Sequence, residues 1–518
     1  MAKQLLSAAI AAPAFFGVNT QESGVTLQEG FAVQADNCVI DKYGRLGARK
    51  GRTTLSVSKD GTSDANVGVN LKGVSNFKDI TGTDLMISWS DTHFYTGSEA
   101  LLTVTPTTSD TISAGNWQAA TLNDHHYFFQ RGYIPLVYTN SSGSVEFESF
   151  AEHDHTTSGY PSANTVLAAY GRLWAADTAT NKTTVYFSTV LDGNKFSTGT
   201  SGTLDISSVL TQGMDEIVAL GAHNGYLIIF CKNNIIIYGD GDNFQTGMTT
   251  TSLTLVEVIQ GVGCIARDSV QNTGEDILFL STSGVRSLNR TVQEKSQPMR
   301  DVSKNIRDDV IQASILENKE LIKAVYSPIN AFYLITFPTS LLTFCFDTRM
   351  PLEDGSLRAT FWPSMLPTGF LSKDSDLFFS GSNGVEKYLG YSDNGVKYEM
   401  DYYSNFFDLE MPNVSKIVKK ISATTVGATG QDFRLKIGYD YSPVFYSYAF
   451  TLDVGNVTEY GVAEYGIAEY LGSIKINNQQ ANSQGAGAII QIGFSIDING
   501  APFSIQRISL YAKQGKVL

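Results

Sequence analysis

Two short histidine clusters are the residues of this chain best suited to metal chemistry. One is the pair His125-His126, and the other is His153-Asp154-His155. Two histidines at positions i and i+2 of a strand share a face and could bind zinc or another transition metal. No third cluster of suitable spacing accompanies them, so polar loops beside a strand are the favoured interpretation. We therefore predict no metal site.

Three further motifs bear on ion, nucleotide or sugar chemistry. Residues 239–243, GDGDN, offer oxygen ligands for calcium but lack the closing glutamate of a helix-loop-helix site, which favours a plain β-turn. Residues 392–395, SDNG, are one fragment of the Ser-x-Asp-x-Gly-x-Thr-Trp box that sialidases repeat, and no second copy follows. The chain contains no Gly-x-x-x-x-Gly-Lys-[Ser/Thr] loop for phosphates. No catalytic residue and no cofactor is predicted.

A basic cluster stands out in an acidic chain. The chain has 37 Lys and Arg against 51 Asp and Glu, a net charge of −14, which disfavours strong binding of nucleic acid phosphates. Two uses of the cluster remain open, phosphate contact and docking onto an acidic neighbouring subunit, and the net charge favours docking. The cluster consists of Lys42, Arg45, Arg49, Lys50 and Arg52.

The composition is typical of an all-β protein. A hydrophobic fraction of 42% is enough for packed cores, and only 17% of the residues are charged. Ser, Thr, Asn and Gly take the place of the missing charges, and 25 Tyr with 29 Phe favour strands. The four cysteines are far apart and lie beside apolar runs, so neither a disulfide framework nor a zinc site is expected. They are Cys38, Cys231, Cys264 and Cys345.

The N-terminus resembles a signal peptide in its pattern. Lys3 precedes the run LLSAAIAA at residues 5–12, with small residues before Pro13. The favoured alternative is a terminal segment that packs against a neighbouring molecule. No apolar run reaches the 18 or so residues that a membrane helix needs, so no membrane span is expected.

Between residues 70 and 395 one unit recurs, an apolar strand, a Gly, Asn or Asp turn, and a second short strand. Successive units begin 41, 46, 54, 51, 55 and 45 residues apart. This period is that of propeller blades, which bury both faces only when they close into a ring. The pattern predicts a β-propeller of six to eight blades, with a pair of β-sandwiches as the alternative. The strongest strands contain Met86, Tyr127, Leu173, Leu227, Leu278, Tyr333 and Phe378.

Two segments depart from this unit. Residues 299–311 predict a helix capped by Asp301 or Ser303, with one apolar face made of Val302, Ile306, Val310 and Ile311. Residues 396–518 predict a C-terminal β-sandwich-like module with strands near 414–426, 433–438, 444–452, 488–498 and 503–512. Inside it, a tandem of Glu-Tyr-Gly units at 456–472 predicts a protruding loop that presents Tyr460, Tyr465 and Tyr470.

Residues 1–69 form the third expected unit, an extended segment and a hairpin that docks on an adaptor or a neighbouring subunit. Lys42-Tyr43-Gly44-Arg45 predicts the tight turn between the two strands of the hairpin. The order of motifs here is Gly-Val-Asn at 17–19, Gly-Phe-Ala at 30–32, Asn-Cys-Val-Ile-Asp at 37–41, then Gly-Arg and a second basic glycine turn. This order resembles the opening of the tail nozzle proteins of short-tailed bacteriophages, also called tail tubular protein B or tail stabilisation proteins.

The resemblance implies a structural virion protein rather than an enzyme. In that family several copies, usually six, form a ring beneath the adaptor, continue the DNA channel for genome ejection and carry tail fibre or spike proteins. It further implies a strand-rich module after the propeller, transient passage of double-stranded DNA without specific binding, and a location in the virion tail. The alternative from the residues alone is a secreted or surface β-propeller that binds or hydrolyses glycans.

Overall fold

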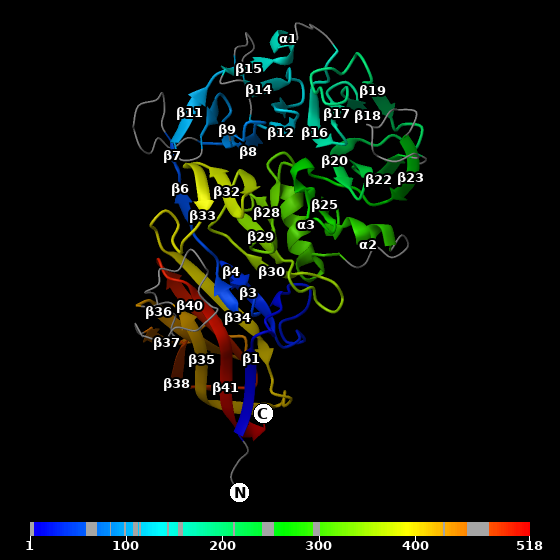
Figure 1. Ribbon diagram of the computed structural model, residues 1–518. Helices are drawn as coiled ribbons and strands as arrows, with labels where there is room; N and C mark the ends of the chain where they lie inside the picture. Colours follow the sequence, from blue (N-terminus) through cyan, green and yellow to red (C-terminus); the bar gives the residue numbers. More distant parts are fainter. Residues whose placement is uncertain are drawn as a thin grey trace.

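The computed structural model describes residues 5–57, 70–82, 84–97, 100–106, 112, 115–141, 144–153, 159–210, 213–240, 253–293, 301–427, 430–452 and 476–517. The fold is mostly β, as the composition predicts. Figure 1 shows a broad ring of sheets at the top and a smaller pair of sheets at the bottom. No described helix is long and apolar enough to cross a membrane.

The ring is a β-propeller with six full blades and one short blade in the described part of the chain. Blade 1 has strands β8 (Gly73–Lys78), β9 (Asp84–Trp89), β10 (Phe94–Thr96) and β11 (Ala100–Val104), with β7 (Ser56–Val57) at its edge. Blade 2 has β12 (Gln118–Leu122), β13 (His125–Phe129), β14 (Leu136–Ser141) and β15 (Ser144–Ser149), followed by helix α1 (Phe150–His153). Blade 3 has β16 (Ala163–Ala169), β17 (Arg172–Thr178), β18 (Thr184–Phe187) and β19 (Gly202–Asp205).

The second half of the ring follows the same plan. Blade 4 has β20 (Ile217–His223), β21 (Tyr226–Cys231), β22 (Asn234–Asp240) and β23 (Leu253–Gln260). The short blade has the 3-10 turn η1 (Arg267–Ser269), β24 (Gln271–Asn272), β25 (Ile277–Ser281) and β26 (Gly284–Ser287), then helix α2 (Leu288–Gln293). Blade 5 has β27 (Lys323–Ser327), β28 (Phe332–Phe337), β29 (Leu342–Asp347) and β30 (Arg358–Phe361). Blade 6 has β31 (Gly369–Lys373), β32 (Asp376–Gly381), β33 (Gly384–Tyr388) and, from the N-terminal segment, β6 (Arg52–Thr54).

The propeller prediction is confirmed, and the two-sandwich alternative for this region is wrong. Each of the seven strong strands in the sequence is the second strand of its blade. Those strands are covered on both faces by neighbouring blades, and β17 and β28 are buried along their whole length, so they are the most apolar. The ring closes because β6 completes blade 6 and the innermost strand β31 contacts β8 of blade 1. Closure leaves no inner face of a blade uncovered.

The predicted helix is present but begins later. A 3-10 turn, η2 (Lys304–Ile306), leads into α3 (Arg307–Leu316), and its N-cap is Ile306, without a side-chain cap. Asp301 is instead paired with Arg286 at 3.0 Å, and the Ser303 hydroxyl accepts the Val285 N–H at 2.9 Å. Both expected caps therefore bind the short blade, which fixes the start of the helical segment there.

The lower body is a sandwich of two sheets around one shared core. The first sheet contains β1 (Leu5–Ala11), β4 (Cys38–Ile40), β5 (Leu46–Ala48), β35 (Val414–Gly427), β38 (Ile476–Asn482), β39 (Ala486–Gly487) and β41 (Phe503–Val517). The second contains β34 (Tyr398–Phe407), β36 (Asp432–Tyr439), β37 (Tyr446–Thr451) and β40 (Ile490–Ile498). The strands expected at 414–426, 433–438 and 503–512 lie within the observed β35, β36 and β41, whereas β37 and β40 each begin two residues later than the strands expected at 444–452 and 488–498.

The N-terminal segment belongs to both bodies. Residues 5–11, which resemble a signal peptide and were expected to pack on a neighbouring molecule, form β1 and pair along their length with β41 of the same chain. The expected hairpin is β4 and β5, closed by a turn in which Asp41 accepts the N–H groups of Tyr43 and Arg45. These strands are thus built into the sandwich, whereas β6 and β7 of the same segment pair with blades 6 and 1.

Strand β3 (Phe31–Asp36) joins the propeller to the sandwich. It pairs antiparallel with β34 of the sandwich and, at Asp36, in parallel with β30 of blade 5. A single ten-stranded sheet therefore runs from blade 5 into the sandwich, with β2 (Gly17–Val18) paired to β3. Gly17 has φ +82°, and a Cβ there would lie 2.6 Å from the Ala359 carbonyl oxygen, so only glycine fits this contact.

A buried histidine ties blade 1 to blade 2. The two ring nitrogens of His126 lie 2.8 Å from the Ser75 hydroxyl on β8 and 2.7 Å from the Thr121 hydroxyl on β12. Burial lowers the pKa of His126 from 6.5 to about 3, so the ring is neutral near pH 7. A neutral imidazole with one donor and one acceptor satisfies both hydroxyls.

We predict that His126 makes the protein lose stability as the pH falls below 6.5. The folded state resists a proton that the unfolded state binds, so the free energy of unfolding drops by about 1.4 kcal/mol per pH unit between pH 6.5 and 3. Urea unfolding of the wild type and of His126→Gln at pH 7 and pH 5 measures this. The variant should show a weaker pH dependence, and an identical dependence in both proteins would contradict the assignment.

Candidate functional site

The predicted basic cluster lies at the junction of propeller and sandwich, and its central member is buried. Arg49 is 0% exposed and its guanidinium forms a two-bond ion pair with Asp393, at 2.7 and 3.0 Å. It also donates to the side chains of Asn37 and Ser364 and packs 4.0 Å from the ring of Tyr398. The Arg49 side chain therefore connects the N-terminal hairpin, the segments that follow blades 5 and 6, and strand β34 of the sandwich.

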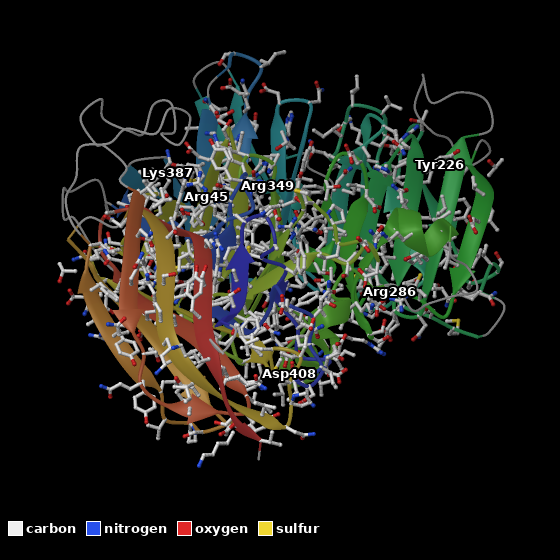
Figure 2. The ribbon with its side chains drawn as sticks, turned by 90° about the horizontal axis from the view of Figure 1, so that it is seen from below. Arg45, Tyr226, Arg286, Arg349, Lys387 and Asp408 are labelled. Atoms are coloured by element: carbon white, nitrogen blue, oxygen red, sulfur yellow. The ribbon has the colours of Figure 1, made fainter. Side chains whose placement is uncertain are left out.

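Two other members of the cluster are also structural. Arg45 is 4% exposed, lies 3.6 Å from Asp41 and covers the ring of Tyr43 at 4.4 Å. Figure 2 places Arg45 near the middle of the molecule, beside the strands of the sandwich. Arg52 lies on β6 and pairs with the buried Glu386 at 3.0 Å, so it fastens the strand that closes blade 6.

The burial corrects the expected docking role. Side chains as buried as Arg45 and Arg49 cannot contact another molecule without unfolding the junction, and both are engaged inside the chain. Lys42 is exposed and Lys50 is partly exposed, with its backbone N–H donated to the Tyr388 hydroxyl. Docking through Lys42 and Lys50 stays a prediction, whereas Arg45, Arg49 and Arg52 are engaged inside the chain.

The sialidase-like fragment at 392–395 has a role in the same joint. Asp393 holds Arg49, and the Asn394 side chain accepts the Thr54 N–H at 2.7 Å and donates to Glu386 at 2.7 Å. Its polar atoms thus fix the junction and the last blade.

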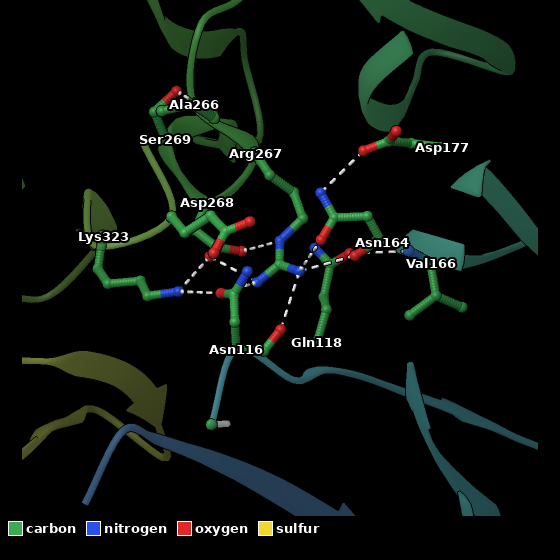
Figure 3. A network of polar contacts seen from close by, with 12 residues as sticks. Asn116, Gln118, Asn164, Val166, Asp177, Ala266, Arg267, Asp268, Ser269 and Lys323 are labelled. Carbon is green, nitrogen blue, oxygen red and sulfur yellow. Dashed lines mark hydrogen bonds and ion pairs between the residues drawn. The ribbon is translucent and has the colours of Figure 1, made fainter. Parts of the chain in front are cut away.

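The centre of the propeller is filled by a charged network (Figure 3). Arg267 of η1 reaches across the ring and donates to the side chains of Asn116, which precedes β12, and of Asn164 on β16. It also forms an ion pair with Asp268 at 2.8 Å, and Asp268 pairs with Lys323 of β27 at 2.5 Å. Lys323 in turn donates to Asn116 at 3.1 Å, so blades 2, 3 and 5 and the short blade meet here.

The charged groups of the network stabilise one another. Burial alone would raise the pKa of Asp268, but Arg267 and Lys323 lower it well below its usual range. Burial lowers the pKa of Lys323, and the Asp268 carboxylate opposes that change. Two cations and one carboxylate in a buried setting are stable only because amide oxygens accept the remaining N–H groups. These contacts join blades that are not neighbours in the ring, so the side chains cross its centre.

Sequence reasoning did not find this network. Arg267 and Asp268 are adjacent, but Asn116, Asn164 and Lys323 lie between 55 and 151 residues away from them. None stands in a recognisable motif, and only the ring brings the starts of the innermost strands together. The sequence offered no signal beyond a charged pair next to an apolar run.

The two histidine clusters meet at one polar pocket between blades 2 and 3. Successive side chains of a strand face opposite sides, so His126 enters the interior while His125 faces the pocket. The rings of His125 and His153 lie 5.6 Å apart, edge to face. The pocket has a volume of about 310 Å³ and is lined by Asn123, His125, Tyr127, His153, Leu191, Asp192, Asn194 and Lys195.

The pocket is polar but holds no metal-ligand set. His125 contacts the Asn123 carbonyl oxygen at 2.8 Å, His153 lies 3.7 Å from Glu148, and Lys195 is paired with Asp192 at 3.0 Å. Among the described residues there is no group of three His, Cys, Asp or Glu placed to hold a metal. Tyr127 is 1% exposed with His125 stacked on it, so its ring face is closed to a sugar.

Several predicted features lie wholly or partly outside the described residues. These are the tyrosine loop with Tyr460, Tyr465 and Tyr470, most of the calcium-like turn, and Asp154 and His155. The four cysteines are described, and all are buried and free, as their apolar surroundings indicate. Burial raises the pKa of Cys264 to about 11, so this thiol behaves as a small hydrophobe.

We predict that breaking the Arg49–Asp393 pair destabilises the protein by about 3–5 kcal/mol, because one buried charge loses its partner. Arg49→Met should show this loss in urea or thermal unfolding. The matched control is Lys42→Met, an exposed cation of the same cluster, which should change stability by less than about 0.5 kcal/mol. Equal effects of the two substitutions would contradict the structural role of Arg49.

No protein-family model and no curated protein matches this chain. Similar solved structures include BamB from Moraxella catarrhalis, at 12% identity over 74% of this chain and 97% of that chain, with a TM-score of 0.37. PorZ, a surface component of the type-IX secretion system of Porphyromonas gingivalis, is 11% identical over 62% of this chain and 37% of that chain, with a TM-score of 0.36. The β-propeller domain of Cps50 (Swd1) from Myceliophteria thermophila is 9% identical over 62% and 95%, with a TM-score of 0.37. Similarities this low carry no functional argument, and the propeller fold rests on the strand pairing of the chain itself.

Proposed function

We propose that the chain is a structural protein of a phage virion, one subunit of a tail nozzle ring that continues the DNA channel of a short-tailed phage. The observation that carries the proposal is the position of the motif residues that resemble the nozzle family. Gly17 packs on blade 5, Phe31 and Ala32 begin the shared strand β3, and Asn37 binds Arg49. The motif therefore encodes the joint between a propeller and a sandwich, which is the architecture that the resemblance implies.

The channel in this proposal lies between copies and not within one. The axis of the propeller is filled by Arg267, Asp268 and Lys323, so a duplex needs an opening enclosed by several subunits. A net charge of −14 supports this arrangement, because a lining that repels phosphates lets DNA slide without sticking. The proposed ring has six copies, sits beneath the adaptor and carries tail fibre or spike proteins.

A catalytic role is not proposed. The pocket beside His125 is the one observation that favours the alternative, a propeller that binds glycans. Its walls offer amide, imidazole and ammonium groups, but the ring face of Tyr127 is covered, and sugar sites commonly use an open aromatic face. Of the two functions, the structural one is better supported.

We predict that the purified full-length protein forms closed rings of about six copies, alone or when mixed with an adaptor ring, with an axial opening wide enough for a DNA duplex. Mass photometry gives the copy number, and negative-stain electron microscopy gives the symmetry. A protein that stays monomeric under both conditions and binds an oligosaccharide on a glycan array would contradict the proposal and support the alternative.

A further inference from the structure

The first sheet of the sandwich, which contains β1, β35 and β41, has a charge pattern unlike that of the whole chain. Its seven strands contain six Lys and Arg and not one Asp or Glu, although the chain as a whole carries a net charge of −14. One of the six, Lys416, is buried and donates to the carbonyl oxygens of Met411 and Ala488, so it belongs to the interior. The other five, which are exposed or half-buried, are Lys419, Lys420, Arg507, Lys513 and Lys516.

Strand register places the central cations on the outward face. On β41, Ile508, Leu510 and Ala512 are buried in the core, so the alternate residues Arg507 and Lys513 point outward. Lys420 lies opposite Tyr511 on the neighbouring strand and shares that face. Arg507 and Lys513 are about 20 Å apart along the strand, so the cations span a broad surface.

Apart from Tyr511, the residues between these cations at the centre of the sheet are small or polar. Ser509 lies between Ala9 of β1 and Ser422 of β35, and Ser422 lies opposite Gln480 of β38. Short side chains at the centre of a sheet let another molecule approach the backbone closely. Lys419, Lys420, Arg507, Lys513 and Lys516 form no ion pair with a described residue. We name these five cations, with the short residues between them, the basic face.

The opposite end of the molecule is acidic. Residues 116–262, which contain blades 2, 3 and 4, have thirteen Asp and Glu against five Lys and Arg. Glu146, Asp205 and Glu216 are exposed there and form no ion pair with a described residue. Figure 1 shows these blades at the top and the sandwich at the bottom, so the two charged regions cannot meet within one molecule.

We propose that the basic face binds the exposed carboxylates of blades 2–4, among them Glu146, Asp205 and Glu216, on a second copy of this chain. Two different, complementary surfaces make a head-to-tail contact, and such contacts close into a ring when the rotation between copies allows it. The inference rests on the ring of the proposed function and assigns its contact surfaces. It places the cations of the sandwich against protein carboxylates and away from DNA, as a sliding genome requires.

The test is charge reversal on the full-length protein, with self-association followed by sedimentation velocity at low and at about 0.5 M salt. The double variant Lys420→Glu/Lys513→Glu should weaken association at least about tenfold at low salt. Lys78→Glu, at an exposed lysine of blade 1, is the control and should associate like the wild type. Added salt should weaken wild-type association and leave the double variant little changed.

A second variant tests complementarity. Adding Glu146→Lys and Glu216→Lys to the double variant reverses both surfaces and should restore much of the lost association. If the double variant assembles like the wild type, the inference is wrong while the ring itself stands. If the wild type never associates, both the inference and the proposed function fail. If the double substitution instead abolishes binding to a random DNA duplex without changing association, the basic face is a nucleic-acid surface and the inference is overturned.

Discussion

The buried ion pair between Arg49 and Asp393 is the interaction on which the whole arrangement depends. A guanidinium with no exposure is tolerable only with nearly every N–H satisfied, and Asn37, Ser364, the Lys50 carbonyl and the carboxylate supply the acceptors. Those acceptors come from the N-terminal segment, the loop after blade 5 and the turn after blade 6. Loss of the Asp393 carboxylate leaves the buried charge uncompensated, and loss of a neutral acceptor removes a hydrogen bond from it, so the Arg49 side chain holds three distant parts of the chain in one geometry.

Strand β3 of the N-terminal segment pairs with the edge strands of two sheets. Blade 5 and the sandwich each have a strand edge that would be open to pairing with another chain, and β3 pairs with β34 of the sandwich over several residues and with β30 of blade 5 at Asp36. A common core continues across this strand, with Ala32 and Ala35 fully buried between the bodies. We infer that the two bodies move as one.

Local patterns predicted the blades well because each blade carries one strand buried on both faces. Tyr127, Leu173 and Tyr333 are apolar or aromatic for that reason, and the spacing of these strands predicted the ring. Contacts between residues far apart in the chain could not be predicted from local patterns. Residues 5–11 resemble a signal peptide until β41 is placed beside them, and Arg49 is indistinguishable from a surface cation until Asp393, 344 residues later, is near. The rings of His125 and His153 are in contact in the fold, although their separation in the sequence does not predict it.

The most direct test is amide hydrogen exchange of the folded protein, with the exchange of β3 measured by mass spectrometry. If β3 is the strand that fuses propeller and sandwich, the amides of residues 31–36 should exchange as slowly as those of β34 and β28, and all three should open together. Exchange of β3 at the rate of a surface loop, while the propeller stays protected, would show that the N-terminal segment merely lies on the molecule and would contradict the account.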